Sequence, residues 1–161
     1  MYHNKKFDFI IVGQGLAGTL LAYDLIELEK SVIIIDTHLK ASASRVAAGL
    51  INPVSMRRCI PAMPSNYLTT AFNRYSDLED KLNSRFLFKK SLLRLFDSFE
   101  TKDLWLDKYE NRQMDLYIDN FCADNTFPFL KDEFSSAIVE PAGHLDLKKF
   151  LTVSREYFRD N

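Results

Sequence analysis

The chain has 161 residues, a formal net charge of −1 and 47% hydrophobic residues. This length is sufficient for a domain with a buried core, and the hydrophobic content excludes an intrinsically disordered chain. Acidic and basic residues are interspersed, so the charge pattern gives no support for a nucleic-acid-binding surface.

Residues 7–36 carry a strand–turn–helix–strand pattern. Phe7–Val12 and Ser31–Ile35 are nearly continuous apolar runs, which are typical of buried parallel strands. Between them, leucines recur at helical spacing, namely Leu16, Leu20, Leu21, Leu25 and Leu28. The pattern predicts two parallel strands joined by a helical crossover of the βαβ type.

A glycine motif, Gly13-Gln14-Gly15-Leu16-Ala17-Gly18, opens the expected helix. In such a motif the first glycine permits a tight turn, the second lets backbone N–H groups approach a pyrophosphate, and the third lets the helix pack closely on the strand. The helix N-terminus adds unpaired donors and a partial positive charge. We therefore expect a dinucleotide site, although glycines also occur where helix–strand packing alone requires them.

Asp36 ends the second predicted strand. A carboxylate at this place accepts hydrogen bonds from the ribose diol of a bound dinucleotide. The alternative is a solvated acid at the end of a strand. The candidate cofactor-binding residues of this first segment are Gly13, Gly15, Leu16, Ala17, Gly18 and Asp36.

Thr37–Met63 is irregular and rich in Ala, Ser and Pro, which predicts a loop around a ligand. Its small side chains would let the backbone lie against a flat, extended molecule. Ser42 and Ser44 are candidates for donating hydrogen bonds to phosphate or ribitol oxygens, and they are equally compatible with ordinary loop or capping roles.

The middle of the chain contains two predicted helices and a strand. Ser65–Phe86 has a continuous apolar face and predicts the longest helix. Phe88–Phe96 is expected to be a strand, and Thr101–Arg112 a shorter helix with Trp105 and Tyr109 on its inner side.

The last third of the chain has weaker signals. Phe121–Phe134 is ambiguous, and Pro128 favours a loop there. Ser136–Val139 predicts a strand, Pro141-Ala142-Gly143 a turn, and Asp146 the N-cap of a closing helix.

Cysteine and histidine usage limits the other kinds of site. The two cysteines and three histidines are scattered, which argues against a metal site and a disulfide framework. No uncharged window approaches the length of a membrane span. We expect a cytoplasmic protein with no metal, nucleic-acid or membrane partner.

Two motifs together resemble a known family. Val46-Ala47-Ala48-Gly49-Leu50 followed by Pro53, taken with the glycine motif, resembles the D-amino-acid oxidase superfamily of FAD-dependent oxidoreductases. Gly143-His144-Leu145-Asp146 is similar to the turn that leads, in this family, from the substrate domain back to the FAD domain.

The resemblance implies an α/β fold with a Rossmann-like FAD/NAD(P)-binding domain of the glutathione-reductase/DAO type. It is truncated relative to the family and carries part of an α+β substrate domain. Residues 1–62 would form the first segment of the FAD-binding domain, 63–134 a partial substrate or cap domain, and 135–161 the return segment.

The resemblance also implies that FAD binds in an extended form. Its ADP part would lie on Gly13–Gly18, with Asp36 at the adenosine ribose. The isoalloxazine would lie near the small-residue loop, at Ala48, Gly49, Leu50 and Asn52.

The activity implied is oxidation of a C–N bond of an amine or amino acid by hydride transfer to flavin N5. In the family, the residues that hold the substrate carboxylate come from a later part of the chain, so the sequence identifies no catalytic residue. Two alternatives stay open: an NAD(P)-dependent dehydrogenase, and a truncated non-catalytic product that binds nucleotide. A missing C-terminal half is the expected macromolecular partner.

Overall fold

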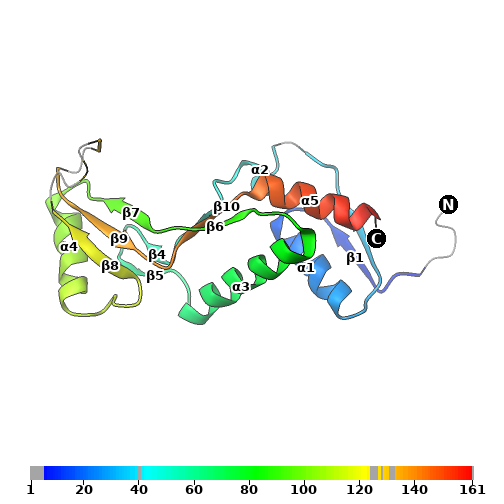
Figure 1. The fold of residues 1–161 in the computed structure, drawn as a ribbon, viewed down its shortest axis with the longest axis horizontal. Coiled ribbons are helices and arrows are strands. Elements are labelled where there is room, and N and C mark those ends of the chain that lie inside the picture. Colours follow the sequence, from blue (N-terminus) through cyan, green and yellow to red (C-terminus); the bar gives the residue numbers. More distant parts are fainter. Residues whose placement is uncertain (1–5, 40, 124–126, 128, 131–132, 161) are drawn as a thin grey trace. The chain divides into compact units, whose positions relative to one another are not determined.

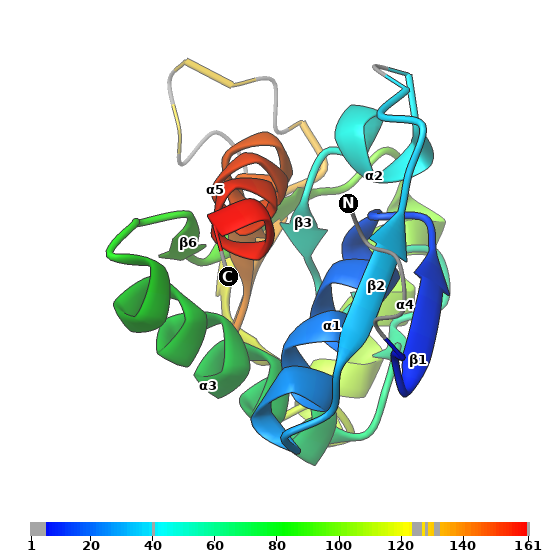
Figure 2. The same cartoon turned by 90° about the vertical axis from the view of Figure 1, so that its right-hand side faces the viewer.

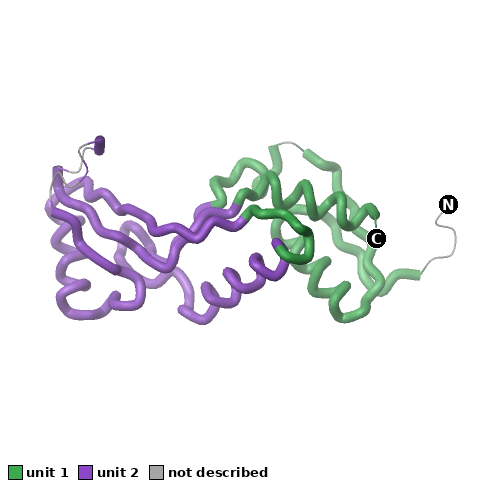
Figure 3. The backbone as a smooth tube through the Cα atoms, in the orientation of Figure 1, with its two compact units in different colours: residues 1–49, 80–86, 146–161 green, residues 50–79, 87–145 purple. Residues whose placement is uncertain are grey.

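A computed structural model describes residues 6–39, 41–123, 127, 129–130 and 133–160 (Figure 1). The fold is mixed α/β and divides into two compact units (Figure 3). Unit 1 comprises residues 1–49, 80–86 and 146–161, and unit 2 comprises residues 50–79 and 87–145. The predicted segments 1–62, 63–134 and 135–161 have different bounds, and their assignment to cofactor and substrate domains stays a prediction.

Unit 1 contains the predicted βαβ element. Strands β1 (Phe9–Val12) and β2 (Val32–Ile35) pair in parallel, and helix α1 (Leu16–Glu27) connects them (Figure 2). In this pairing Phe9 lies opposite Val32 and Val12 lies opposite Ile35. The predicted parallel pair and the crossover helix are both confirmed.

The burial predicted for these strands is wrong. Ile11 is 6% exposed, whereas Ile10 is 66% and Val12 82% exposed, and Ile35 of β2 is 53% exposed. Within the described ranges the sheet has only these two strands. Ile10 and Val12 alternate with the buried Ile11 along β1, so the face of the sheet that carries them is uncovered. The expectation of burial came from the general rule that parallel strands are covered on both faces.

An aromatic cluster forms the interior of unit 1. Helix α5 (Leu147–Asp160) packs against α1, and the Tyr23 ring centroid lies 4.6 Å from that of Phe158. The Lys81 ammonium lies 5.4 Å from the Tyr23 centroid and forms a 3.2 Å ion pair with Glu27. The α1 residues buried here are Thr19, Ala22 and Tyr23, so the predicted leucine stripe is not the buried face.

Asp146 caps α5 as predicted. Its Oδ1 accepts a hydrogen bond from the Lys149 N–H at 3.0 Å, and its carbonyl accepts one from the Phe150 N–H. This side-chain bond satisfies one of the backbone donors that a helix start leaves free. Leu147, Phe150 and Leu151 then face the interior.

Unit 2 is built on antiparallel pairing. One sheet has the order β3–β10–β6 and a second has the order β7–β9–β8, while β4 and β5 form a separate hairpin (Figure 1). The strands are β3 (Leu50–Ile51), β4 (Val54–Ser55), β5 (Ile60–Pro61), β6 (Leu87–Lys89), β7 (Leu92–Leu95), β8 (Ile118–Cys122), β9 (Ser136–Val139) and β10 (Gly143–Leu145).

Several sequence expectations change in these sheets. Thr37–Met63 is not wholly irregular, because it contains the helical turn α2 (Ala43–Val46) and strands β3 to β5. Phe88–Phe96 is two strands, β6 and β7, which join different sheets. The predicted turn at Gly143 is strand β10, at the centre of its sheet. Short strands depend on partners distant in sequence, so local patterns do not show them.

Two helices contribute to unit 2, α4 as a whole and α3 up to Glu79. Helix α3 (Ser65–Leu82) buries the predicted face but ends at Leu82, where Asn83 adopts φ +44°, a conformation that commonly ends helices. Helix α4 (Phe99–Glu110) begins at the cap Ser98, whose Oγ accepts from the Thr101 N–H at 3.2 Å.

Trp105, on α4, is fully buried as predicted. It belongs to a core that α4 shares with the β7–β9–β8 sheet and the β4–β5 hairpin, comprising Val54, Cys59, Phe96, Trp105, Met114, Tyr117, Ile118, Ala137 and Val139. Strand β9 has the predicted bounds, whereas the loop expected at Pro128 lies outside the described residues. Within the described parts, no helix is both long and apolar enough to cross a membrane.

The first prediction concerns Asp8, which ties the start of β1 to β2. Its Oδ2 accepts from the Ser31 O–H at 2.7 Å and from the Ser31 N–H at 2.8 Å. These bonds hold the pKa of Asp8 below its ordinary value of 3.8. A carboxyl with a lowered folded-state pKa stabilises the fold above its unfolded-state pKa, and the effect is lost as pH falls through the folded-state pKa.

Asp8→Asn is therefore expected to lower the free energy of unfolding slightly at pH 7. The difference from the unsubstituted chain should disappear once the pH is well below 3.8. Denaturant unfolding at several pH values measures this, with Glu29→Gln, an exposed carboxylate before β2, as the control. A difference that persists unchanged at low pH would contradict it.

The second prediction concerns Gly143 in the central strand β10. A Cβ at this position would lie 2.8 Å from the Phe88 carbonyl oxygen and 3.1 Å from Phe72 Cε1. Gly143→Ala must therefore displace a strand neighbour, and we expect a loss of about 1–3 kcal/mol of unfolding free energy. His144→Ala, at the exposed next position, should cost less than about 0.5 kcal/mol. Equal midpoints for the two variants in urea would refute this.

Candidate functional site

The glycine turn between β1 and α1 has the geometry of a close backbone approach. Gly13 has φ +97°, and its N–H donates to the Ile35 carbonyl at 2.7 Å. A Cβ on Gly18 would lie 2.1 Å from the Gly13 carbonyl oxygen, so no larger residue fits while α1 keeps this position. The first and third glycines thus serve the turn and the helix packing in the way their spacing indicates.

Ser44 lies at the N-terminus of α1. Its Oγ accepts a hydrogen bond from the Leu16 N–H at 2.9 Å, and a Cβ on Gly15 would lie 3.0 Å from this oxygen. Ser42 is the N-cap residue before the helical turn α2, and its side chain makes no capping hydrogen bond. The structure therefore brings Ser44 into contact with the glycine motif.

Asp36 holds the turn together from the end of β2. Its Oδ2 accepts from the Gln14 N–H at 2.8 Å, and its Oδ1 accepts from the His38 N–H at 2.6 Å. The Arg155 guanidinium on α5 lies 3.8 Å from Oδ1, and Arg45 Nη2 lies 3.1 Å from His38 Nδ1. Asp36 is therefore not a solvated strand-end acid but the centre of a polar network in unit 1.

These groups suit the ADP part of a dinucleotide. The start of α1 leaves backbone N–H groups without intrahelical partners, and Gly15 supplies no capping side chain. Gln14 Nε2 is buried and has no hydrogen-bond partner among the residues described. Free donors at a helix N-terminus favour an anionic group, and the Asp36 carboxylate is an acceptor for hydroxyl groups.

The residues predicted to lie near a flavin ring divide between the two units. Ala48 and Gly49 belong to unit 1, whereas Leu50 and Asn52 belong to unit 2. Gly49 has φ +70°, so a bend occurs there that an L residue would strain. Leu50 is 55% exposed, and Asn52 Oδ1 accepts from the Val54 N–H at 3.1 Å. Their proximity to a ring stays a prediction.

Cys59 is a core residue in the β4–β5 hairpin. Its side chain is fully buried, and this burial raises the pKa of the thiol to about 11. The Lys108 ammonium donates to the Cys59 carbonyl oxygen at 2.9 Å, which joins α4 to the hairpin. The neutral thiol at pH 7 is a poor nucleophile, so covalent attachment of a cofactor at Cys59 is disfavoured.

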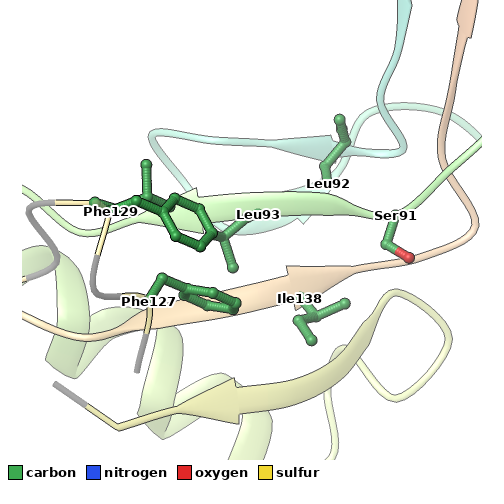
Figure 4. Close-up of a pocket in the computed structure, with 7 residues that line it drawn as sticks. Ser91, Leu92, Leu93, Phe127, Phe129 and Ile138 are labelled. Carbon is green, nitrogen blue, oxygen red and sulfur yellow. The ribbon is translucent and has the colours of Figure 1, made fainter. Parts of the chain in front are cut away.

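An apolar hollow of about 290 Å³ lies against the β7–β9–β8 sheet of unit 2 (Figure 4). It is lined by Ser91, Leu92, Leu93, Phe127, Phe129, Leu130 and Ile138. In Figure 4 the side chains of Leu93, Phe127 and Ile138 converge on one space. No charged side chain is among these lining residues, so the hollow suits an apolar group rather than a carboxylate.

Two polar residues of the unit 1 network, Gln14 and Arg155, were not predicted from the sequence. Gln14 lies inside the glycine motif, and its buried, unpartnered amide nitrogen is visible only once its packing is known. Arg155 follows the buried Ser154 on α5, and the helical pattern places it at the edge of the buried face. Nothing in the local pattern links Arg155 to Asp36, because the contact joins opposite ends of the chain.

Comparison with protein families gives one family for the chain. The model of the family described as FAD dependent oxidoreductase matches residues 8–161. The comparison with curated proteins gives no significant match.

Solved structures with the same fold include amino acid oxidases and deaminases. Glycine oxidase from Bacillus cereus is 21% identical with a TM-score of 0.70, over 94% of this chain and 44% of that one. Glycine oxidase from Geobacillus kaustophilus is 18% identical with a TM-score of 0.72, over 92% and 43%. L-Amino acid deaminase from Proteus myxofaciens, in complex with anthranilate, is 14% identical with a TM-score of 0.72, over 96% and 36%.

These values confirm the predicted α/β fold. At such low identity the structural matches establish the fold alone. The chain spans less than half of the length of each of these three structures.

The third prediction tests Ser44 as a cap of α1. Ser44→Ala removes the acceptor of the Leu16 N–H, and we expect the free energy of unfolding to fall by about 1 kcal/mol. Ser42→Ala is the matched control, since the Ser42 side chain makes no capping bond. Urea unfolding of both variants compares them, and an equal loss in the two would argue against this role of Ser44.

Proposed function

The chain belongs to the family of FAD-dependent oxidoreductases, and from this premise we propose that it binds FAD and takes part in oxidising a C–N bond of an amine or amino acid. The support is the network that joins the glycine turn, Ser44 and Asp36 in unit 1. The structural neighbours named as amino acid oxidases and deaminases support this choice of substrate class.

In this proposal the ADP part of FAD is held by unit 1. The backbone N–H groups of Gly15 and Ala17 at the start of α1 donate to the diphosphate, whereas that of Leu16 donates to Ser44 Oγ. Asp36 accepts from the adenosine ribose, and the Ser44 hydroxyl, already bonded to the Leu16 N–H, donates its own proton to a phosphate oxygen. Gly13 and Gly18 act indirectly, because they let the turn and helix occupy these positions.

The residues near Ala48–Asn52 are proposed to face the flavin ring, with Gly49 making the bend that small side chains allow. Bound FAD would supply the hydride acceptor for the oxidation. The part played by this chain is to bind the cofactor, orient it and exclude water from it. No described residue is assigned to proton transfer or to the substrate carboxylate.

The substrate, the partner and the location of the chain are further parts of the proposal. The chain spans 36–44% of the length of the structures compared, so the substrate, a C-terminal partner segment and a cytoplasmic location stay predictions. A nicotinamide-dependent dehydrogenase lacks support, because the matching family is FAD-dependent. A nucleotide-binding product without catalysis remains the competing hypothesis.

The fourth prediction tests FAD binding. Titrating the 161-residue chain into FAD should quench flavin fluorescence and shift the yellow absorbance bands. Gly15→Ala places a Cβ 3.0 Å from Ser44 Oγ and against the expected diphosphate, and we expect about tenfold weaker binding. Gly143→Ala, in unit 2, is the matched control and should keep the affinity at a temperature where both variants are folded.

Bleaching of the bound flavin by an amine or amino acid without oxygen would support catalysis. Binding without bleaching by any of these substrates would favour the non-catalytic hypothesis. A chain that takes up NADH and not FAD would contradict the proposal.

A further inference from the structure

We propose that Arg155 is a positioning residue of the nucleotide site: it orients the Asp36 carboxylate and so determines recognition of the ribose 2′-hydroxyl. The inference rests on the proposed binding of an adenine dinucleotide by unit 1. It makes the closing helix α5 part of a site whose motif lies near the start of the chain.

The first step is the set of donors around Asp36. The Gln14 N–H bonds to Oδ2, while the His38 N–H bonds to Oδ1 and the Arg155 guanidinium lies 3.8 Å from the same oxygen. An ionised carboxylate offers about four acceptor positions on its two oxygens. Each oxygen has one N–H donor, the Arg155 ion pair adds attraction toward α5 on the Oδ1 side, and an acceptor position remains on Oδ2 for a ligand hydroxyl.

The second step is electrostatic. The proposed diphosphate site at the start of α1 lies close to Asp36. The Gln14 N–H, in the turn just before α1, donates a hydrogen bond to the Asp36 carboxylate. Two anionic groups so close repel each other, and a cation beside one of them offsets the repulsion. Arg155 is such a cation, since its guanidinium lies 3.8 Å from Asp36 Oδ1, and the pair is partly shielded from solvent, with the two side chains 36% and 20% exposed.

The third step is the rigidity of the position from which Arg155 acts. Its helix, α5, packs against α1 and α2. The preceding turn of α5 is buried, with Leu151 1% and Ser154 0% exposed. The backbone at Arg155 is therefore held in place, and a guanidinium on a fixed backbone loses less freedom when it pairs.

The competing explanation is a partly exposed ion pair that only joins α5 to β2. Such pairs contribute little to stability, and their loss does not change which ligand is preferred. Arg159 provides the comparison on the same helix, because its ion pair is with its neighbour Asp160 and its side chain is 73% exposed.

The experiment is calorimetric titration of the 161-residue chain with ADP and with 2′-deoxy-ADP. The unsubstituted chain should bind ADP about tenfold more tightly than 2′-deoxy-ADP, since the 2′-hydroxyl bonds to a charged acceptor. Arg155→Gln should reduce this ratio to about twofold, and Arg155→Lys, which keeps the charge but not the planar fork, should give an intermediate ratio. Arg159→Gln should keep the full ratio, and circular dichroism checks that each variant is folded.

The outcomes separate this inference from the proposed function. If the chain binds ADP and both Arg155 variants keep the full ratio, Arg155 is only structural and the inference is overturned. A third titration uses ADP that carries a 2′-phosphate; tighter binding of this nucleotide than of ADP would also overturn the inference, because Arg155 would then be a phosphate ligand. Failure of the unsubstituted chain to bind any adenine nucleotide would remove the proposed function and the inference with it.

Discussion

The glycine turn between β1 and α1 depends on the close approach of helix α1 to the backbone of the turn that precedes it. A Cβ at Gly18 would overlap the Gly13 carbonyl oxygen at 2.1 Å, so this approach requires a residue without a side chain. The approach brings the start of α1 to the carboxyl ends of β1 and β2. Asp36 and Ser44 can then reach the Gln14 and Leu16 N–H groups. The polar network therefore depends on a backbone contact that is possible only because Gly18 has no Cβ atom.

Local patterns predicted those elements whose cause is local. The helical face of α3 and the Asp146 cap of α5 depend on residues within one or two turns, and both are found. The division of Phe88–Phe96 between two sheets was not predictable, since it depends on pairing with β9 and β10 far along the chain. The exposure of Ile10 and Val12 could not be read from their apolar run either, because such a run does not show how many layers cover it.

The candidate site follows the same division. The glycine spacing and Asp36 were predictable, because a strand–turn–helix places them together through covalent geometry. The contact of Ser44 with the helix start required the path of the intervening loop, and Ser42 had an equal claim from the sequence. The contact between Arg155 and Asp36 had no sequence signal, since the two residues lie far apart in the chain.

Nucleotide recognition and redox chemistry make separate demands on this chain. The groups suited to the ADP part all lie in unit 1, where backbone donors, Asp36 and Ser44 are held by contacts within that unit. The loop predicted to face the ring changes units after Gly49, so its chemistry depends on contacts beyond those of unit 1. Under the proposed function, affinity for the nucleotide would be set by this network, whereas catalysis would also require the ring and a substrate to be enclosed. The first property can persist where the second is lost, which is why cofactor binding alone does not demonstrate oxidase activity.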